Sequence, residues 1–142
     1  MGIQQTLLLV LLTIIVGLAL VSSVNVVENR MVQHNQDAVR QDMIRASTMA
    51  QALWERPVIL GGAGRNFSGH FTEAELLSVL QISGWPTEDG DIQNENGVYS
   101  IEEISESGFT MNAKPSYGNH IKRMQVWMDE STRRWEVQIA AE

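Results

Sequence analysis

The sequence predicts an α+β fold in which a long N-terminal helix packs against a C-terminal antiparallel β-sheet of three or four strands. Three observations support this. The first 27 residues carry no formally charged side chain, residues 28–55 have apolar side chains at helical spacing, and residues 98–140 alternate apolar and polar side chains. The chain therefore divides into a stem helix over 1–55, a glycine-rich connection over 56–97 and a sheet over 98–142.

The apolar segment 1–27 is long enough to cross a lipid bilayer. Its run from Leu7 to Val21 is interrupted only by Thr13 and Gly17, and the uncharged flanks extend it beyond the roughly 20 residues that a membrane-spanning helix needs. Such a helix can be a cleaved export signal, a permanent anchor or an oligomerisation stem. Gly17 and the pair Ser22-Ser23 are the places where this helix could bend or open.

The flanks of this segment differ from those of an ordinary secretory signal. Such signals begin with basic residues and have an apolar core of about 7 to 15 residues. Here the first basic residue is Arg30, well after the apolar run. Two interpretations fit: a short basic leader has been removed from a precursor, or the segment is a one-helix anchor with an atypical flank.

Residues 28–55 continue the helix as an amphipathic half. No Pro or Gly occurs between Asn25 and Arg56, and Pro57 ends the element. The polar residues Arg30, Asp37, Arg40, Gln41, Asp42, Arg45 and Gln51 are expected on a wetted face. The opposite face is an apolar stripe predicted to pack on the sheet, formed by Val32, Val39, Met43, Ala46, Ala50 and Leu53.

The connection 56–97 contains one predicted helix. Thr72 and Glu75 fit a capping box, and the apolar residues that follow predict a short helix over 72–82. The glycine-rich stretch 61–64 is predicted to be a turn-rich loop.

The sheet region has one apolar face and one wet face. The side chains expected to face the stem helix are Met124, Val126, Met128, Trp135, Val137 and Ile139. Trp127 falls on the other face, where it is either a subunit contact or a singly exposed aromatic residue. A sheet of this size needs a partner for its apolar face, and the stripe on 32–53 is the candidate.

Composition excludes several functions. The net charge of −7 disfavours nucleic-acid binding, which requires a basic face. The absence of cysteine removes disulfides, thiolate catalysis and cysteine zinc sites. No nucleophile, acid–base pair or cofactor motif is present, so we expect neither an enzyme nor a bound cofactor.

Three weaker motifs remain. His34, His70 and His120 are far apart and are expected at the surface rather than in a metal site. Asp89, Asp91 and Glu95 have part of the spacing of a calcium loop, without its glycine at the sixth place and its glutamate at the twelfth. Asn66 begins an N-x-S sequence and is a candidate glycosylation acceptor.

The whole arrangement resembles a type IV pilin. The start Gly2-Ile3-Gln4-Gln5-Thr6-Leu7-Leu8-Leu9 is similar to a group of small bacterial pilin-like proteins that begin Gly-Gln-Gln-Gln-Leu-Leu-Leu. The likeness recurs at Arg56-Pro57, Gly61 to Gly64, Phe67 to Gly69 and Glu95 to Tyr99.

The resemblance implies a life cycle as well as a fold. It implies removal of a leader by a prepilin peptidase, storage in the inner membrane, and export by pilus assembly machinery into an extracellular filament of identical subunits on the bacterial surface. The side chains expected in the filament core are Gln4, Gln5, Leu7, Leu8, Leu11, Ile14, Ile15, Leu18 and Val21.

Three features depart from the pilin pattern. Familiar pilins have Glu at the fifth mature position, where this chain has Gln5, and an amide cannot neutralise a neighbouring ammonium group. The mid-stem proline and the C-terminal disulfide loop of many pilins are also absent.

The expected function is therefore the major subunit of a helical filament. Two other functions fit the same features: a monomeric membrane-anchored binding module, or a minor pseudopilin of a secretion or DNA-uptake machine. The sequence does not rank adhesion, motility or DNA uptake as roles of the filament.

Overall fold

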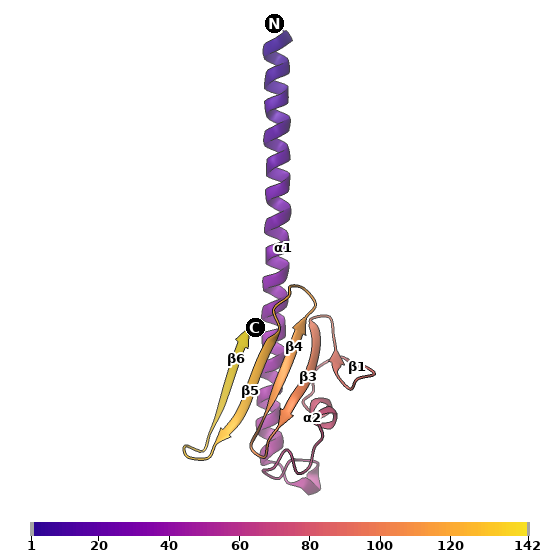
Figure 1. Ribbon diagram of the computed structural model, residues 1–142, viewed down its shortest axis with the longest axis vertical. Helices are drawn as coiled ribbons and strands as arrows, with labels where there is room; N and C mark the ends of the chain where they lie inside the picture. The colour runs from indigo at the N-terminus through magenta and orange to yellow at the C-terminus, as the bar shows by residue number, and fades with distance from the viewer. Residues whose placement is uncertain (1, 142) are drawn as a thin grey trace. The chain divides into compact units, whose positions relative to one another are not determined.

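The computed structural model describes residues 2–141 and contains two compact units, one ending at His34 and one beginning at Asn35 (Figure 1). The helical elements are α1 (Gly2–Glu55), the 3-10 turn η1 (Val58–Leu60) and α2 (Glu73–Val79). The strands are β1 (Trp85–Pro86), β2 (Ile92–Gln93), β3 (Gly97–Ile104), β4 (Gly108–Pro115), β5 (Lys122–Asp129) and β6 (Arg134–Ala141).

The first unit is the N-terminal part of α1. It remains helical through Gly17 and through the pair Ser22-Ser23, so neither place opens the helix. The hydroxyls of Ser22 and Ser23 donate to the carbonyls of Leu18 and Ala19 at 2.9 and 2.8 Å. These bonds keep both serines compatible with the helix.

The second unit is built on an antiparallel sheet of six strands in chain order, from β1 to β6. The four long strands fall where the alternation predicted them. The other two, β1 and β2, lie in the segment predicted as loop, because a turn from Thr87 to Asp91 folds the chain back on itself. Two-residue strands in a polar run leave no periodic pattern to detect.

The short helix α2 has the predicted capping box. The Thr72 hydroxyl accepts from the Glu75 N–H, and the Glu75 carboxylate accepts from the Thr72 N–H at 3.0 Å. The helix ends at Val79, earlier than predicted, since Gln81 adopts a left-handed backbone with φ 57°.

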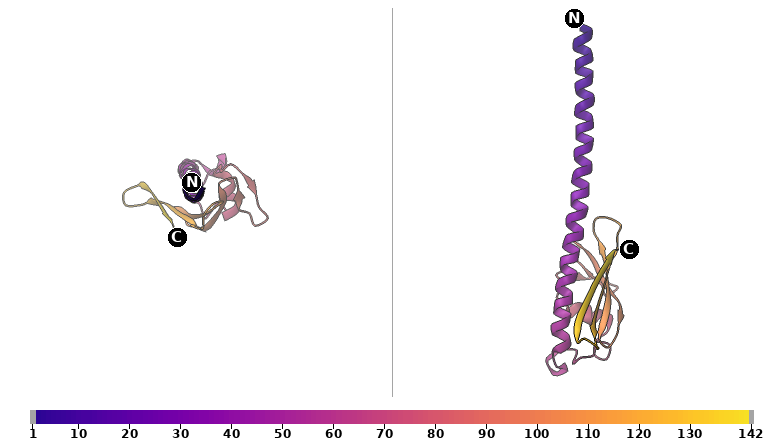
Figure 2. Two further views of the ribbon diagram at one scale, coloured as in Figure 1. Left: turned by 90° about the horizontal axis from the view of Figure 1, so that it is seen from above. Right: turned by 90° about the vertical axis from the view of Figure 1, so that its left-hand side faces the viewer.

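The C-terminal part of α1, from Asn35, lies along one face of the sheet (Figure 2). Four members of the predicted stripe, Val39, Met43, Ala46 and Ala50, have no exposed surface, and Leu53 is also buried. Met124 and Val126 are buried on the facing side of β5, as expected. They share this core with Tyr99, Phe109, Met111 and Ala113 on β3 and β4.

The predicted packing of Val137 on the helix is wrong. Val137 is 39% exposed, and Met128, Trp135 and Ile139 are only half-buried. β6 is the edge strand of the sheet, and burial decreases toward that edge. Val32, the first residue of the predicted stripe, belongs to the first unit and is half-buried.

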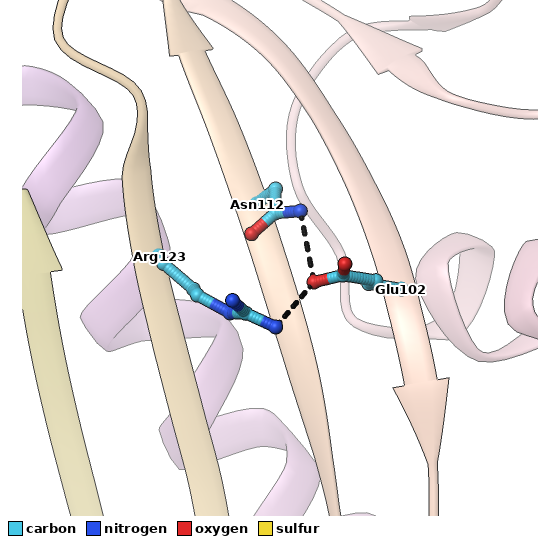
Figure 3. A network of polar contacts seen from close by, with 3 residues as sticks. All are labelled: Glu102, Asn112 and Arg123. Atoms are coloured by element: carbon cyan, nitrogen blue, oxygen red, sulfur yellow. Dashed lines mark hydrogen bonds and ion pairs between the residues drawn. The ribbon is translucent and has the colours of Figure 1, made fainter. Parts of the chain in front are cut away.

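The other face of the sheet carries polar side chains. Glu102 lies at a register shift in β3 and accepts from Asn112 at 3.2 Å and from Arg123 at 2.7 Å (Figure 3). Trp127, on this face, is half-buried. The side chains of the Glu102–Arg123 ion pair are both partly exposed, so we expect the pair to add only about 0–1 kcal/mol to the free energy of unfolding.

Small residues set the approach of helix to sheet. The Ala50 side chain is fully buried between helix and sheet. Ala50→Leu adds three carbon atoms at this crowded position, so it should lower the free energy of unfolding by about 1–3 kcal/mol. Ala52→Leu, at an exposed position of the same helix, is the matched control and should change little. Urea denaturation of the full chain in detergent measures both, and equal stability of the two variants would contradict this packing.

Candidate assembly interface

The largest uncovered apolar surface of the described residues is the first part of α1. No charged residue occurs from Gly2 to Val27. Its large apolar side chains are each at least 50% exposed, with Ile3 at 82% and Leu8 at 67%. We call residues 2–27 the stem. Water around such a surface is unfavourable at about 25 cal/mol per Å² of apolar area.

The hydroxyl side chains of the stem do not interrupt this surface. Thr6 donates to the Gly2 carbonyl at 2.6 Å, and Thr13 donates to the Val10 carbonyl at 2.8 Å. Ser22 and Ser23 bond in the same way within the helix. The stem therefore needs no outside partner for these groups, which is the condition for a helix in lipid or in a dry bundle.

The predicted core residues are all exposed, but they are not set apart from their neighbours. Leu7, Leu11, Ile14 and Leu18 are 54–66% exposed, and the residues between them, such as Leu12, are exposed to a similar degree. The apolar surface therefore surrounds the helix instead of forming one stripe. The same property fits a membrane-spanning segment, and α1 is the one helix among residues 2–141 that is long and apolar enough to span a membrane.

A partly buried polar clamp fastens the second part of α1 to the sheet and to the loops beside it. One carboxylate oxygen of Asp42 accepts from Tyr99 Oη at 2.7 Å, from Asn96 Nδ2 at 2.9 Å and from Asn94 Nδ2 at 3.1 Å. Asn35, one heptad earlier, donates to the Asn96 carbonyl at 2.7 Å and accepts from the Tyr117 N–H at 3.0 Å.

This clamp corrects the assignment of Asp42 to the wetted face. Asp42 is half-buried, as is Gln51 from the same predicted set. Asn35 and Asp42 are seven residues apart and share the period of the stripe that contains Val39 and Ala46. That spacing was the signal that could have revealed them.

The clamp holds Tyr99 in its neutral form. Burial, followed by the hydrogen bond to Asp42 and the charge of that carboxylate, raises the pKa of Tyr99 far above its usual 10.0, while Asn94 opposes the shift. The phenol is therefore a permanent hydrogen-bond donor at any physiological pH.

Aromatic contacts fasten the C-terminal end of α1. The rings of Trp54 and Trp135 meet edge to face, with their centroids 5.5 Å apart. The centroid of the Phe67 ring lies 6.4 Å from that of Trp135 and 5.8 Å from that of Phe109. Arg65 lies 5.7 Å from the Trp54 ring centroid and pairs with Glu55 at 3.3 Å. Both ends of the sheet-facing helix are thus held by contacts with distant parts of the chain.

The weaker sequence motifs lie in separate parts of the second unit and in α1. Among residues 2–141 no three His, Cys, Asp or Glu side chains converge, and Asp89, Asp91 and Glu95 are not brought together as such a group. Burial and the neighbouring Asp89 charge raise the pKa of Asp91. The three histidines are exposed. Asn66 is half-buried, and its side-chain oxygen accepts a hydrogen bond from the Gly69 N–H at 2.8 Å. Its glycosylation stays a prediction.

Comparison with protein-family models, with curated proteins and with solved structures gives no match to this chain. The arguments for function therefore rest on the stem, the clamp and the surface of the second unit.

The clamp predicts a large loss of stability on removal of its acceptor. Asp42→Ala leaves three donors without their shared partner, and should lower the free energy of unfolding by about 2–4 kcal/mol. Asp37→Ala, an exposed aspartate on the same helix, is the control and should change it by less than about 0.5 kcal/mol. Equal effects in urea denaturation would show that the clamp adds nothing to stability.

Tyr99 also predicts a pH dependence. Its folded-state pKa is raised, so its contribution to stability is complete below the unfolded value of about 10 and decreases as pH rises above it. Above pH 10 the unfolded chain loses the Tyr99 proton while the folded chain keeps it. The free energy of unfolding therefore falls by about 1.4 kcal/mol per pH unit. The slope of unfolding free energy above pH 10 should be shallower in Tyr99→Phe. Identical slopes in both proteins would contradict the raised pKa.

Proposed function

We propose that this protein is the major structural subunit of a helical surface filament, of the type IV pilus kind, in which the stems of many copies form a shared core. The observation that carries the proposal is the uncharged stem, which is exposed on all sides and is joined to a unit with its own core. The fold of one long N-terminal helix and an antiparallel sheet is compatible with this function.

Bundling of stems removes the unfavourable contact with water. If each stem buries roughly 2,000 Å² of apolar surface, the gain is on the order of tens of kcal/mol before the entropy of association is subtracted. An apolar surface that surrounds the helix favours several neighbours over one. A stem with a single stripe would be satisfied by a dimer.

The second unit suits the outside of such a filament. All but one of the acidic residues and all but one of the basic residues lie from Asn35 onward. The core and the polar clamp of this unit need no contribution from the stem, since they are made by residues 35–141. A heterologous contact repeated along an axis then gives an open helical polymer.

Two other functions remain distinguishable by experiment. A membrane-anchored monomer uses the stem as a single span, and its purified form is a monodisperse detergent complex. A minor pseudopilin shares the fold but is scarce and stays within an assembly machine. Abundant sheared filaments made mainly of this chain favour the major subunit over both.

A charge in the stem should separate membrane insertion from assembly. Ile14→Arg costs about 2.5–3.5 kcal/mol in membrane insertion, which the remaining apolar run offsets, so the chain should still fractionate with membranes. In the filament the same arginine recurs in every copy without a counter-ion, so we expect filaments to fall below detection by electron microscopy. Ile14→Leu, which conserves volume, should assemble normally.

The opposite pattern would refute the proposal. Normal filament yield from Ile14→Arg would mean that the middle of the stem is not buried between copies. Complete absence of filaments from the unmodified protein in its native host, with the chain present as a detergent monomer, would favour the anchored module.

A further inference from the structure

The chain contains one Asn-Gly pair, Asn96-Gly97, and this pair belongs to the clamp. Asparagine followed by glycine is especially prone to spontaneous deamidation, because glycine has no side chain to hinder attack by its backbone nitrogen on the asparagine amide. Packing requires both residues here. Asn96 Nδ2 donates to Asp42 at 2.9 Å, and a Cβ on Gly97 would lie 2.4 Å from the Lys114 carbonyl oxygen. The fold therefore places a reactive pair at the contact between α1 and the sheet.

The deamidation reaction consumes only water. The Gly97 nitrogen loses its proton and bonds to Cγ of Asn96, the C–N bond of the side-chain amide breaks, and the amide nitrogen leaves with that proton as ammonia. Water then opens the resulting succinimide ring at one of its two carbonyl carbons. Residue 96 becomes aspartate if one ring bond breaks, and isoaspartate, with an extra methylene group in the main chain, if the other does.

Asn94 holds the attacking nitrogen. Its side-chain oxygen accepts from the Gly97 N–H at 3.1 Å and from the Asn96 N–H at 2.9 Å. The Gly97 carbonyl accepts in turn from the Asn94 N–H at 2.9 Å, so Asn94 and Gly97 are bonded in both directions. Gly97 is also buried. Its nitrogen cannot attack without first breaking the bond to the Asn94 side chain.

The group under attack, the Asn96 amide, is held as well. Its Nδ2 donates to Asp42, while the backbone carbonyl of Asn96 accepts from Asn35 Nδ2 at 2.7 Å and from the Ser116 N–H at 2.8 Å. Ring closure requires the Asn96 side chain and the peptide bond that follows it to rotate toward each other. The bonds to Asn35, Asp42 and Ser116 oppose both rotations.

We propose that Asn96 is a deamidation site that the clamp keeps closed in the folded chain. An intact clamp protects the amide, and opening of the clamp exposes it to irreversible conversion. The inference does not depend on the proposed function, since every residue in it belongs to the second unit.

Conversion prevents the clamp from closing again. An ionised acid at position 96 has no N–H to donate to Asp42, and it brings a second carboxylate to a contact that now measures 2.9 Å. Like charges this close repel each other strongly. Isoaspartate also lengthens the main chain immediately before Gly97, where β3 begins. A single opening of the clamp is in this way made permanent.

Peptide mapping by mass spectrometry measures the conversion. The full chain in detergent, incubated at mildly alkaline pH, should keep its Asn96 amide, and should convert it once urea has unfolded the second unit. The variant His120→Gly is the positive control, because it creates an Asn-Gly pair at the exposed residue Asn119. Asn119 should convert in the folded variant while Asn96 does not. Equal rates at the two positions in the folded protein would overturn the proposal.

Removal of the Asn94 side chain tests its protective role. Asn94→Ala should speed the conversion of Asn96 in the folded chain by roughly ten-fold, because two hydrogen bonds no longer oppose local opening. Ala50→Leu is the matched control, since it weakens the same unit through its core and leaves the clamp residues unchanged. At equal free energy of unfolding, Asn96 should convert faster in Asn94→Ala than in Ala50→Leu. Equal rates would show that only global unfolding exposes Asn96, and would overturn the proposal.

The other outcomes also decide the matter. An unaltered rate at Asn96 in folded Asn94→Ala contradicts the protection. If Asn94→Ala does not fold, low concentrations of urea on the unmodified chain make the same distinction. Conversion should then rise less steeply with urea than the unfolded fraction does, as local opening requires, and a parallel rise would overturn the proposal.

The effect on the clamp has a separate readout. Asn96→Asp reproduces the aspartate product and should lower the urea midpoint of unfolding, as Asp42→Ala does. An unchanged midpoint would contradict the claim that conversion disables the clamp.

Discussion

Water cannot favourably surround residues 2–27, and nothing in the described part of this chain covers them. Those residues carry no charge, and their hydroxyls bond to their own helix. The surface needs lipid or other stems as a partner. The remaining features of the chain are consistent with an exchange between these two environments.

The sheet-bearing unit is held together by its own contacts, so the proposed exchange would not require it to refold. Its core joins α1 from Val39 to Leu53 with four long strands, and Asn35 and Asp42 fix the helix through hydrogen bonds to the β2–β3 connection and to Tyr99. A unit held in this way can keep its fold while its stem moves from one apolar environment to another.

The clamp combines packing with positional specificity. Apolar contacts between Ala46, Ala50 and the sheet tolerate sliding of the helix, because they are not directional. Three donors directed at one oxygen of Asp42 fix the helix in a single register. Two of the connecting loops are bonded to α1, through the Asn96 carbonyl on Asn35 and through the Ala63 N–H on the Leu53 carbonyl.

Much of this fold could be predicted from periodicity. The stripe from Val39 to Leu53 and the four long strands follow from spacings of 3.6 and 2, and the capping box at Thr72 follows from local hydrogen bonding. The spacing of Asn35 and Asp42 placed both on the face of the stripe, but their polar partners lie far along the chain and are not marked by any periodicity. The exposure of Val137 was also missed, because alternation assigns a face but does not show how far the helix covers it.

The candidate interface could be predicted in part only. The stem is visible in the sequence as an uncharged run, but the residues expected in its core are no more exposed than those beside them. The exposed apolar turn η1 (Val58–Leu60) could not be predicted, because it depends on backbone hydrogen bonds in a loop without periodicity.

The most direct test is an electron cryomicroscopy reconstruction of native material that contains this chain. The account predicts a filament whose centre is filled by parallel helices assigned to residues 2–27, with the sheets on the outside and no lipid in the core. A reconstruction or detergent complex in which each stem is surrounded by lipid alone, without a neighbouring stem, would contradict it.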